Sequence, residues 1–181
     1  MLNYSREQLV DLGAEITTRE IHQQPQVWQT AFDAYKAHQT EIEAFLDSID
    51  GKHDYIKVIF TGAGTSAYVG DTLIPYLRSI YDERKWNFNS VATTDIVANP
   101  LTHLRKHVPT VLVSFARSGN SPESVATVDL AKQLVDELYQ VTITCAAEGK
   151  LAQQAHGDER NLLLLQSKET NDAGFAMTSS F

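Results

Sequence analysis

Small hydroxyl residues gather at two points in this sequence where an apolar, strand-like run gives way to a helix-like one. The first segment is TGAGTSAYVGD, residues 61–71, and the second is SFARSGNSPESV, residues 114–125. Hydroxyls and free backbone N–H groups at the start of a helix attract anions, because the helix dipole is positive there. The two segments therefore point to anion binding, with ordinary turns and helix capping as the alternative.

The first segment combines glycines with hydroxyls. Gly62 and Gly64 let the backbone approach a ligand closely and adopt positive φ angles. Thr65 and Ser66 then place hydroxyls and N–H groups at the expected start of a helix. A phosphate pocket without lysine fits this composition best, and a tight glycine turn that binds nothing is the alternative.

Two nucleotide-binding motifs fit the first segment less well. The glycine pattern of residues 62–67 matches the dinucleotide fingerprint, but that motif needs an acid about 20 residues later, at the end of the next strand. Glu83 falls before the end of that strand, and Asp95 comes too late. A Walker A loop is excluded by its spacing, and because Asp71 stands where that motif would need lysine.

The second segment has more polar groups than a helix start requires. Capping explains residues 121–123 (Ser-Pro-Glu) as N-cap, first helical residue and first-turn acid. It does not explain Ser118, Gly119 or Arg117, which precede the cap. Hydroxyls at 118 and 121, free N–H groups and one guanidinium could surround a phosphate monoester. An anion site is therefore favoured over capping alone.

Composition excludes several function classes. The chain has 181 residues and a formal net charge of −8, with no basic cluster suited to a nucleic-acid backbone. No apolar stretch approaches the roughly 20 residues that span a bilayer, and no signal peptide is evident. The single Cys145 permits no internal disulfide and fits a cytoplasmic protein. The pair His103 and His107 precedes Val-Pro and reads as a solvated loop rather than a metal site.

The first fifty residues are expected to form helices. Thr17 and Glu20 fit a capping box at one helix start, and Pro25 suits the first turn of a second helix. From Trp28 to Ile49, apolar residues recur at helical spacing. We therefore interpret residues 1–52 as an N-terminal helical extension.

Beyond residue 53, short apolar runs alternate with longer amphipathic ones. Such alternation indicates right-handed βαβ units, and so a parallel five-stranded sheet between two helical layers, an α/β/α sandwich. The expected strands are 56–61, 87–94, 110–115, 139–145 and 161–167, and the expected helices include 65–81, 121–138 and 149–156. Ligands of such folds lie beyond the carboxyl ends of the strands. The last residues resemble a helix that is just beginning, which suggests a longer natural protein.

Five segments together resemble the sugar isomerase (SIS) domain family, which binds phosphosugars on a flavodoxin-like parallel sheet. They are EIHQQPQVW (20–28), FTGAGTSAYVGD (60–71), TTDIVANP (93–100), SFARSGNSPESVATV (114–128) and ETNDAGFAMTSS (169–180). Within the family, the chain is most similar to two-module proteins described as tagatose-6-phosphate ketose/aldose isomerases or galactosamine-6-phosphate deaminase/isomerases. The resemblance implies that residues 53–181 form a SIS domain and that a second such domain is not present.

The resemblance also implies which residues bind the ligand, a hexose or hexosamine 6-phosphate. The implied phosphate and sugar contacts are Gly64, Thr65, Ser66, Arg117, Ser118, Gly119, Ser121, Phe175, Ala176 and Met177. One departure stands out. Related glucosamine-6-phosphate synthase domains carry Ser-x-Ser in the phosphate loop, whereas this chain has Ala116, Arg117 and Ser118.

The activity implied by the resemblance is aldose–ketose isomerisation or deamination of an amino-sugar phosphate, with no metal or redox cofactor. The general base would be a Glu of the second domain, so this chain alone should bind ligand but turn over little. Glu169 and Asp172 are the carboxylates on a ligand-side loop, although a structural role is favoured for each. Assembly into homo-oligomers is expected. The alternative is a non-catalytic phosphosugar-sensing module.

Overall fold

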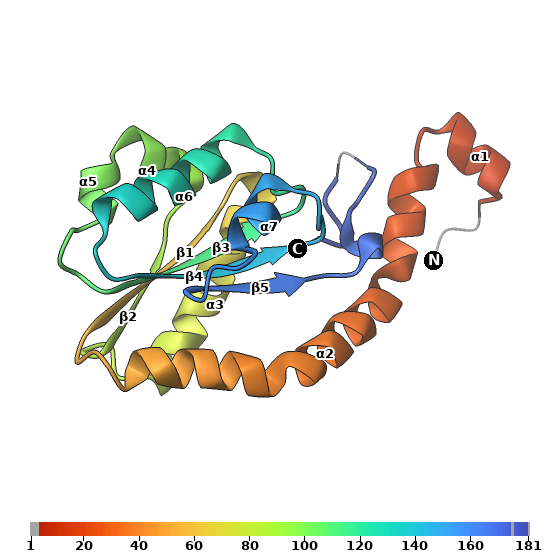
Figure 1. The fold of residues 1–181 in the computed structure, drawn as a ribbon. Helices are drawn as coiled ribbons and strands as arrows, with labels where there is room; N and C mark the ends of the chain where they lie inside the picture. Colours follow the sequence, from red (N-terminus) through yellow and green to blue (C-terminus); the bar gives the residue numbers. More distant parts are fainter. Residues whose placement is uncertain (1–3, 175, 181) are drawn as a thin grey trace.

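A computed structural model describes residues 4–174 and 176–180 and confirms the α/β sandwich. Five parallel strands form one sheet in the order β2-β1-β3-β4-β5 (Figure 1). The strands are β1 (Ile56–Gly62), β2 (Trp86–Ser90), β3 (Thr110–Ala116), β4 (Leu138–Thr144) and β5 (Asn161–Leu165). This is the flavodoxin-like order expected from the resemblance.

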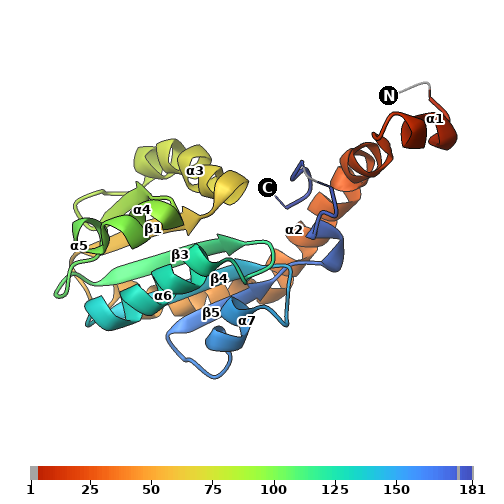
Figure 2. The same ribbon diagram turned by 90° about the horizontal axis from the view of Figure 1, so that it is seen from above.

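Helices cover both faces of the sheet. One face carries α2 (Glu15–Asp50) and α3 (Ala67–Ile80), and the other carries α4 (Thr93–Ala98), α5 (Pro100–His103), α6 (Pro122–Leu134) and α7 (Lys150–Ala155) (Figures 1 and 2). A short α1 (Arg6–Asp11) precedes them, and two 3₁₀ turns, η1 (Gly64–Ser66) and η2 (Lys168–Thr170), follow β1 and β5. No helix in the described part of the chain is long and apolar enough to cross a membrane.

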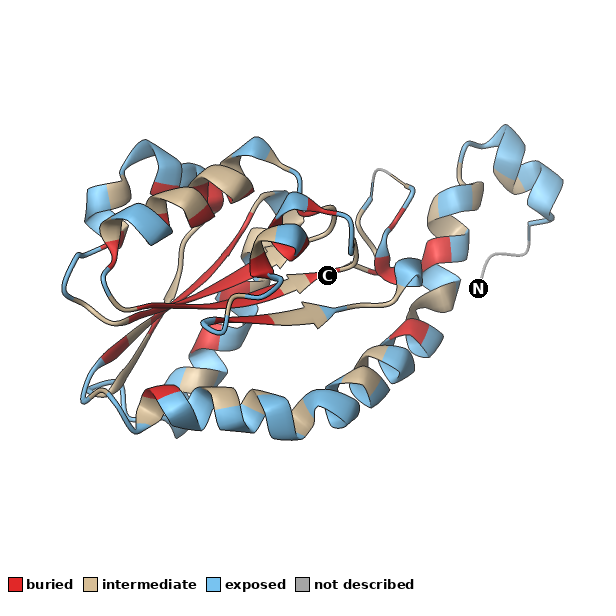
Figure 3. Cartoon of the chain, in the orientation of Figure 1, coloured by how far each residue is buried: buried red, intermediate tan, exposed pale blue. Residues whose placement is uncertain are grey.

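The alternation of side chains along each strand builds two cores, one on each face of the sheet. Val58 and Phe60 of β1 pack with Ile49 of α2 and Ile74 of α3. Ile59, between them in sequence, points to the opposite face and packs in the core under α4 and α6. Buried residues accordingly follow the strands in Figure 3, because every strand of this parallel sheet is covered on at least one side.

The order of the strands fixes where a ligand can bind. The connections that follow β1 and β3 run in opposite directions across the sheet. The connection after β1 leads to β2, beside β1 on one side, and the connection after β3 leads to β4, beside β3 on the other side. The two strands run parallel in register, with Gly62 opposite Phe115. The carboxyl ends of β1 and β3 therefore form the switch point, where α/β folds hold their ligands.

The expected break at Pro25 was wrong, because residues 15–50 form one continuous helix. Proline inside a helix removes one backbone hydrogen bond and is tolerated where tertiary contacts compensate. Here the helix is held on both sides of Pro25, by the buried Glu20 before it and the buried Val27 after it. The capping box expected at Thr17 was also wrong, since Thr17 lies inside α2, whose N-cap is Ala14. Ser5 and Gln8 instead form a capping box at the start of α1.

Beyond residue 53, two element ends differ from the sequence-based expectation by four residues, more than any other end there. The strand predicted for residues 87–94 ends at Ser90, and Thr93 already begins α4. The buried Thr93 hydroxyl donates to the carbonyl of Gly62, 3.3 Å away, which ties this turn to the end of β1. The helix predicted for residues 121–138 ends at Leu134, because β4 begins at Leu138.

Candidate functional site

The two hydroxyl-rich segments meet at the switch point. Residues 63–66 leave β1, residues 115–121 include the end of β3, and both segments line one cavity of about 300 Å³. Of the residues predicted to bind a phosphosugar, this cavity is lined by Gly64, Thr65, Ser66, Arg117, Ser118, Gly119, Ser121 and Met177. Ala176 is exposed and is not among the lining residues, and Phe175 lies outside the described residues.

Both segments depend on glycine for their shape. Gly64 has a φ of +57° and Gly119 a φ of +63°, in the left-handed region that other residues seldom adopt. The positive φ at Gly64 lets the chain turn into η1 directly after β1. At Gly119 it lets the chain fold back before α6 begins. These conformations hold the loop amides and hydroxyls around the cavity.

The serine hydroxyls around the cavity are not used for helix capping. Ser66 and Ser121 occupy the N-cap positions of α3 and α6, but neither side chain caps its helix. The Ser121 hydroxyl instead donates to the Ser124 hydroxyl, 2.7 Å away. Ser118 Oγ accepts a hydrogen bond from the backbone N–H of Asn120, at 3.3 Å. Ser124 was missed in the sequence, although its three-residue spacing from Ser121 could have indicated it.

The segment after β4 holds the loop of residues 116–121 from behind. The carbonyl of Arg117 accepts hydrogen bonds from Thr144 Oγ1 at 3.2 Å and from Cys145 Sγ at 3.1 Å. The carbonyl of Gly119 accepts from the N–H of Leu151, at 3.1 Å. These contacts satisfy two carbonyl acceptors of the loop and fix its shape beside the cavity.

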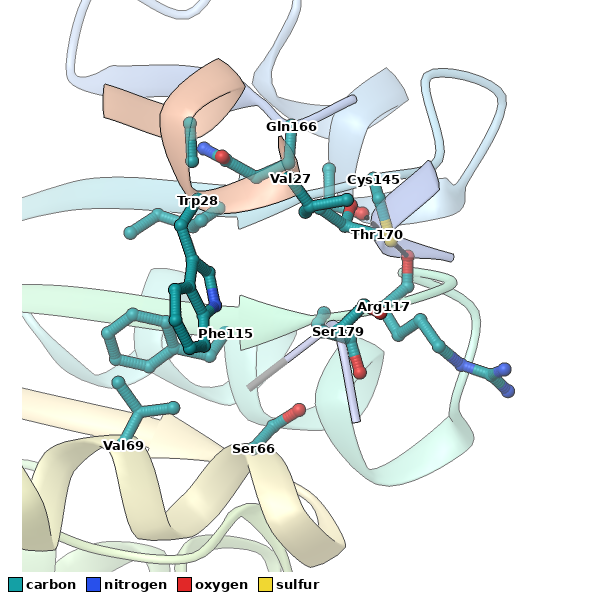
Figure 4. Close-up of a pocket in the computed structure, with 15 residues that line it drawn as sticks. Val27, Trp28, Ser66, Val69, Phe115, Arg117, Cys145, Gln166, Thr170 and Ser179 are labelled. Carbon is teal, nitrogen blue, oxygen red and sulfur yellow. Dashed lines mark hydrogen bonds between the residues drawn. The ribbon is translucent and has the colours of Figure 1, made fainter. Parts of the chain in front are cut away.

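Arg117 is the one charged residue among the described residues that line this cavity. Its guanidinium donates a hydrogen bond to the backbone carbonyl of Asp172. Arg117 is half-buried, and in Figure 4, which draws a second cavity beside this one, its side chain extends away from the other labelled residues. Arg117 therefore joins the loop after β3 to the segment after β5, while its positive charge stays near the cavity.

A second cavity of about 280 Å³ lies beside the first (Figure 4). Its wall includes Trp28 of α2, Val69 of α3 and Phe115 of β3, and it is mainly apolar. The two cavities share Ser66, Phe115, Ala116, Arg117 and Ser180. No local pattern in the sequence indicated this cavity, since its walls come from elements far apart in the chain.

Neither candidate carboxylate lines the cavities. Asp172 is 2% exposed, and its carboxylate accepts hydrogen bonds from the N–H groups of Ser179 and Ser180, both at 2.9 Å. Glu169 is exposed. Its backbone N–H bonds to its own side-chain carboxylate, and this bond holds the pKa of Glu169 below its usual value. Among the described lining residues there is no Asp, Glu, His or Lys. The described residues of the two cavities therefore place no carboxylate where it would repel a bound anion, and supply no carboxylate base.

The dinucleotide interpretation fails at the second strand. That motif needs an acid at the end of β2, which here ends at Ser90. Glu83 lies before β2 and pairs with Arg78 at 2.9 Å, and Asp95 is an exposed residue of α4. Within residues 4–174 and 176–180, no group of three His, Cys, Asp or Glu is arranged to hold a metal ion.

Comparison with known proteins gives relatives along the whole chain. Residues 53–181 match the SIS domain family. A D-galactosamine-6-phosphate deaminase, AgaS, from Shewanella sp. strain ANA-3 is 44% identical over 98% of this chain and 45% of its own length. The chain thus spans about half the length of this curated relative.

Two crystal structures resemble the present one closely. A candidate tagatose-6-phosphate ketose/aldose isomerase from Clostridium novyi NT is 42% identical, with a TM-score of 0.90 over 98% of this chain and 44% of that one. A tagatose-6-phosphate ketose/aldose isomerase from Escherichia coli is 42% identical, with a TM-score of 0.83 over 90% of this chain and 43% of that one.

Proposed function

The chain belongs to the SIS domain family, and we propose that it is the phosphosugar-binding part of an amino-sugar-phosphate deaminase or isomerase. The observation that carries the proposal is the cavity at the ends of β1 and β3. Hydroxyls of Ser66, Ser118 and Ser121, the loop amides and the start of α6 surround a space that can hold a phosphate group. Arg117 supplies a positive charge at its edge.

The proposed ligand is a hexose or hexosamine 6-phosphate. A phosphate monoester offers oxygen acceptors to the hydroxyl and N–H donors of the two loops. The sugar would extend from the phosphate toward the segment after β5, where Met177 and Ser180 line the same cavity. The similar proteins are named as a galactosamine-6-phosphate deaminase and a tagatose-6-phosphate ketose/aldose isomerase, and these names support this class of ligand.

The proposed reaction moves a proton between the first two carbons of the open-chain sugar. With galactosamine 6-phosphate, the resulting imine at carbon 2 takes up water and releases ammonia, which leaves tagatose 6-phosphate. The step needs a positioned base and firm anchoring of the phosphate. This chain's residues would supply the anchoring, because no carboxylate is among the described residues that line the cavities. We propose that the base comes from a second SIS domain.

The decisive experiment separates binding from turnover. Calorimetric titration of this chain with galactosamine 6-phosphate and glucosamine 6-phosphate should show binding, whereas NAD and NADP should give no heat of binding. Ammonia release should be seen with a full-length protein that carries both halves, and little or none with this chain alone. Lack of binding to every hexose 6-phosphate would refute the proposal, and full activity of this chain alone would refute the placement of the base.

A non-catalytic phosphosugar-sensing module is the second candidate, and the observation that favours it is that no carboxylate is among the described residues lining the cavities. The same experiment distinguishes the two, because a sensor would bind hexose 6-phosphates in its full-length form without releasing ammonia. A cytoplasmic location and assembly into homo-oligomers stay predictions from the sequence.

A further inference from the structure

The long helix α2 carries one buried carboxylate, that of Glu20. In the sequence it is distant from both proposed phosphate-binding loops. Glu20 of α2 is only 3% exposed. Its Oε1 accepts hydrogen bonds from the backbone N–H of Ala173 at 2.7 Å and of Gly174 at 3.1 Å. Within the described part of the chain, Glu20 forms no salt bridge. A carboxylate is costly to bury unless hydrogen bonds replace its hydration, and here backbone amides do so.

The contact between Glu20 and Gly174 leaves no room for a side chain. A Cβ atom at position 174 would lie 2.7 Å from Glu20 Oε2 and 3.3 Å from a methyl group of Ile16. The carboxylate and the glycine are therefore closely fitted, so the position of one sets the position of the other.

Other polar residues of the same helix face hold the same segment. Gln23 Nε2 donates to the carbonyl of Glu169 and to Ser179 Oγ, both at 3.0 Å. Gln24 donates through its side-chain amide to the carbonyl of Thr178. Positions 20, 23 and 24 share one side of a helix because of the 3.6-residue repeat. In Figure 2 the segment that follows β5 lies along this part of α2.

The segment that α2 holds is one wall of the proposed binding site. Met177 and Ser180 line the first cavity together with the phosphate-binding loops. We propose that Glu20 is a positioning residue, which through the amides of residues 173 and 174 sets the place of this wall relative to the phosphate-binding loops. This role rests on the proposed function, in which the segment of residues 173–180 contacts the sugar and the loops of residues 63–66 and 116–121 contact the phosphate.

The test uses this chain and two ligands of different size. Glu20→Gln keeps the shape of the side chain but puts an amide where two N–H groups need an acceptor. We expect affinity for galactosamine 6-phosphate to fall about tenfold, the size of a lost charge-assisted hydrogen bond. Affinity for inorganic phosphate should stay the same, because the loops of residues 63–66 and 116–121 do not contact Glu20. Glu41→Gln, an exposed residue of the same helix, is the control and should change neither affinity.

A second variant keeps the test valid if Glu20→Gln folds poorly. Gly174→Ala keeps Glu20 but puts a Cβ atom 2.7 Å from its Oε2, so this substitution alone should lower affinity for galactosamine 6-phosphate and leave affinity for inorganic phosphate unchanged. Unchanged affinity for galactosamine 6-phosphate in Glu20→Gln, or in Gly174→Ala, would overturn the role of Glu20 alone. Failure of the unaltered chain to bind any hexose 6-phosphate would instead overturn the proposed function, and this role with it.

Discussion

The guanidinium of Arg117 donates a hydrogen bond to the backbone carbonyl of Asp172, 55 residues further along the chain. Arg117 directly precedes Ser118, in the loop after β3, while Asp172 begins the segment that carries Met177 and Ser180. The contact thus joins the proposed phosphate side of the site to the proposed sugar side. Several properties of the site follow from such links between segments that are distant in sequence.

Asp172 is expected to stabilise the folded chain rather than to catalyse. Its buried carboxylate accepts hydrogen bonds from the N–H groups of Ser179 and Ser180. Asp172→Asn turns an N–H₂ group toward one of these donors, so the free energy of unfolding should fall by about 2 kcal/mol. Urea unfolding followed by circular dichroism measures this. Glu169→Gln is the exposed control and should change stability by less than about 0.5 kcal/mol; an equal effect of both substitutions would contradict a structural role for Asp172.

The paired substitution Ser118→Ala and Ser121→Ala should weaken binding of both inorganic phosphate and hexose 6-phosphates. Each hydroxyl that donates to a charged phosphate oxygen is worth about 1.5 kcal/mol or more, so the loss should be at least tenfold. Calorimetric titration measures it. Ser79→Ala on α3 is the control, because its hydroxyl bonds only within its own helix, to the carbonyl of Tyr76. Unchanged phosphate affinity in the paired variant would remove the phosphate site from these loops.

Gly119→Ala and Gly157→Ala form a matched pair. Both glycines have positive φ, at +63° and +75°, so alanine should cost each about 1 kcal/mol of stability. Only Gly119 lies in the proposed phosphate-binding loop; Gly157 lies in the turn between α7 and β5. Ligand affinity should therefore fall in Gly119→Ala and stay the same in Gly157→Ala. Measuring unfolding and binding on both variants separates backbone strain from the shape of the loop.

Stability at alkaline pH should depend on Tyr139. Burial, with the nearby Glu137 carboxylate, raises the pKa of this phenol above its usual 10.0, and its hydroxyl lies 3.0 Å from His53 Nε2. A raised pKa means that the folded state keeps the proton longer than the unfolded state. The stabilisation is therefore complete below pH 10 and is lost as the pH rises through the folded-state pKa.

Tyr139→Phe removes this dependence. The unaltered chain should be the more stable one at pH 8, and the difference in the free energy of unfolding should shrink as the pH rises past 10. Urea midpoints between pH 8 and 11 measure the difference, and exposed Tyr76→Phe serves as the control. A difference that stays constant across this range would show that Tyr139 ionises alike in both states.

The sequence alone determined the layered fold and the two loops. Strand-like runs such as residues 110–115 are apolar enough to be buried on both faces, and their alternation with helices leaves few topologies. Ser118 and Gly119 could be assigned to the loop because capping at Ser121 left them unexplained. These signals are local, since they depend on residues a few positions apart. Local patterns of this kind can be recognised in a single sequence.

Only the tertiary structure decided what surrounds those loops. Nothing near Pro25 indicates that residues 15–50 continue as one helix, because the contacts that hold it come from residues 169–180. The burial of Glu20 and the direction of Arg117 likewise depend on partners more than 50 residues distant. The bonds to the buried Asp172 carboxylate form only when residues 172–180 fold back on themselves. A side chain's type and spacing predict which chemistry it can perform, but its burial and its partners arise from packing, which brings distant segments together.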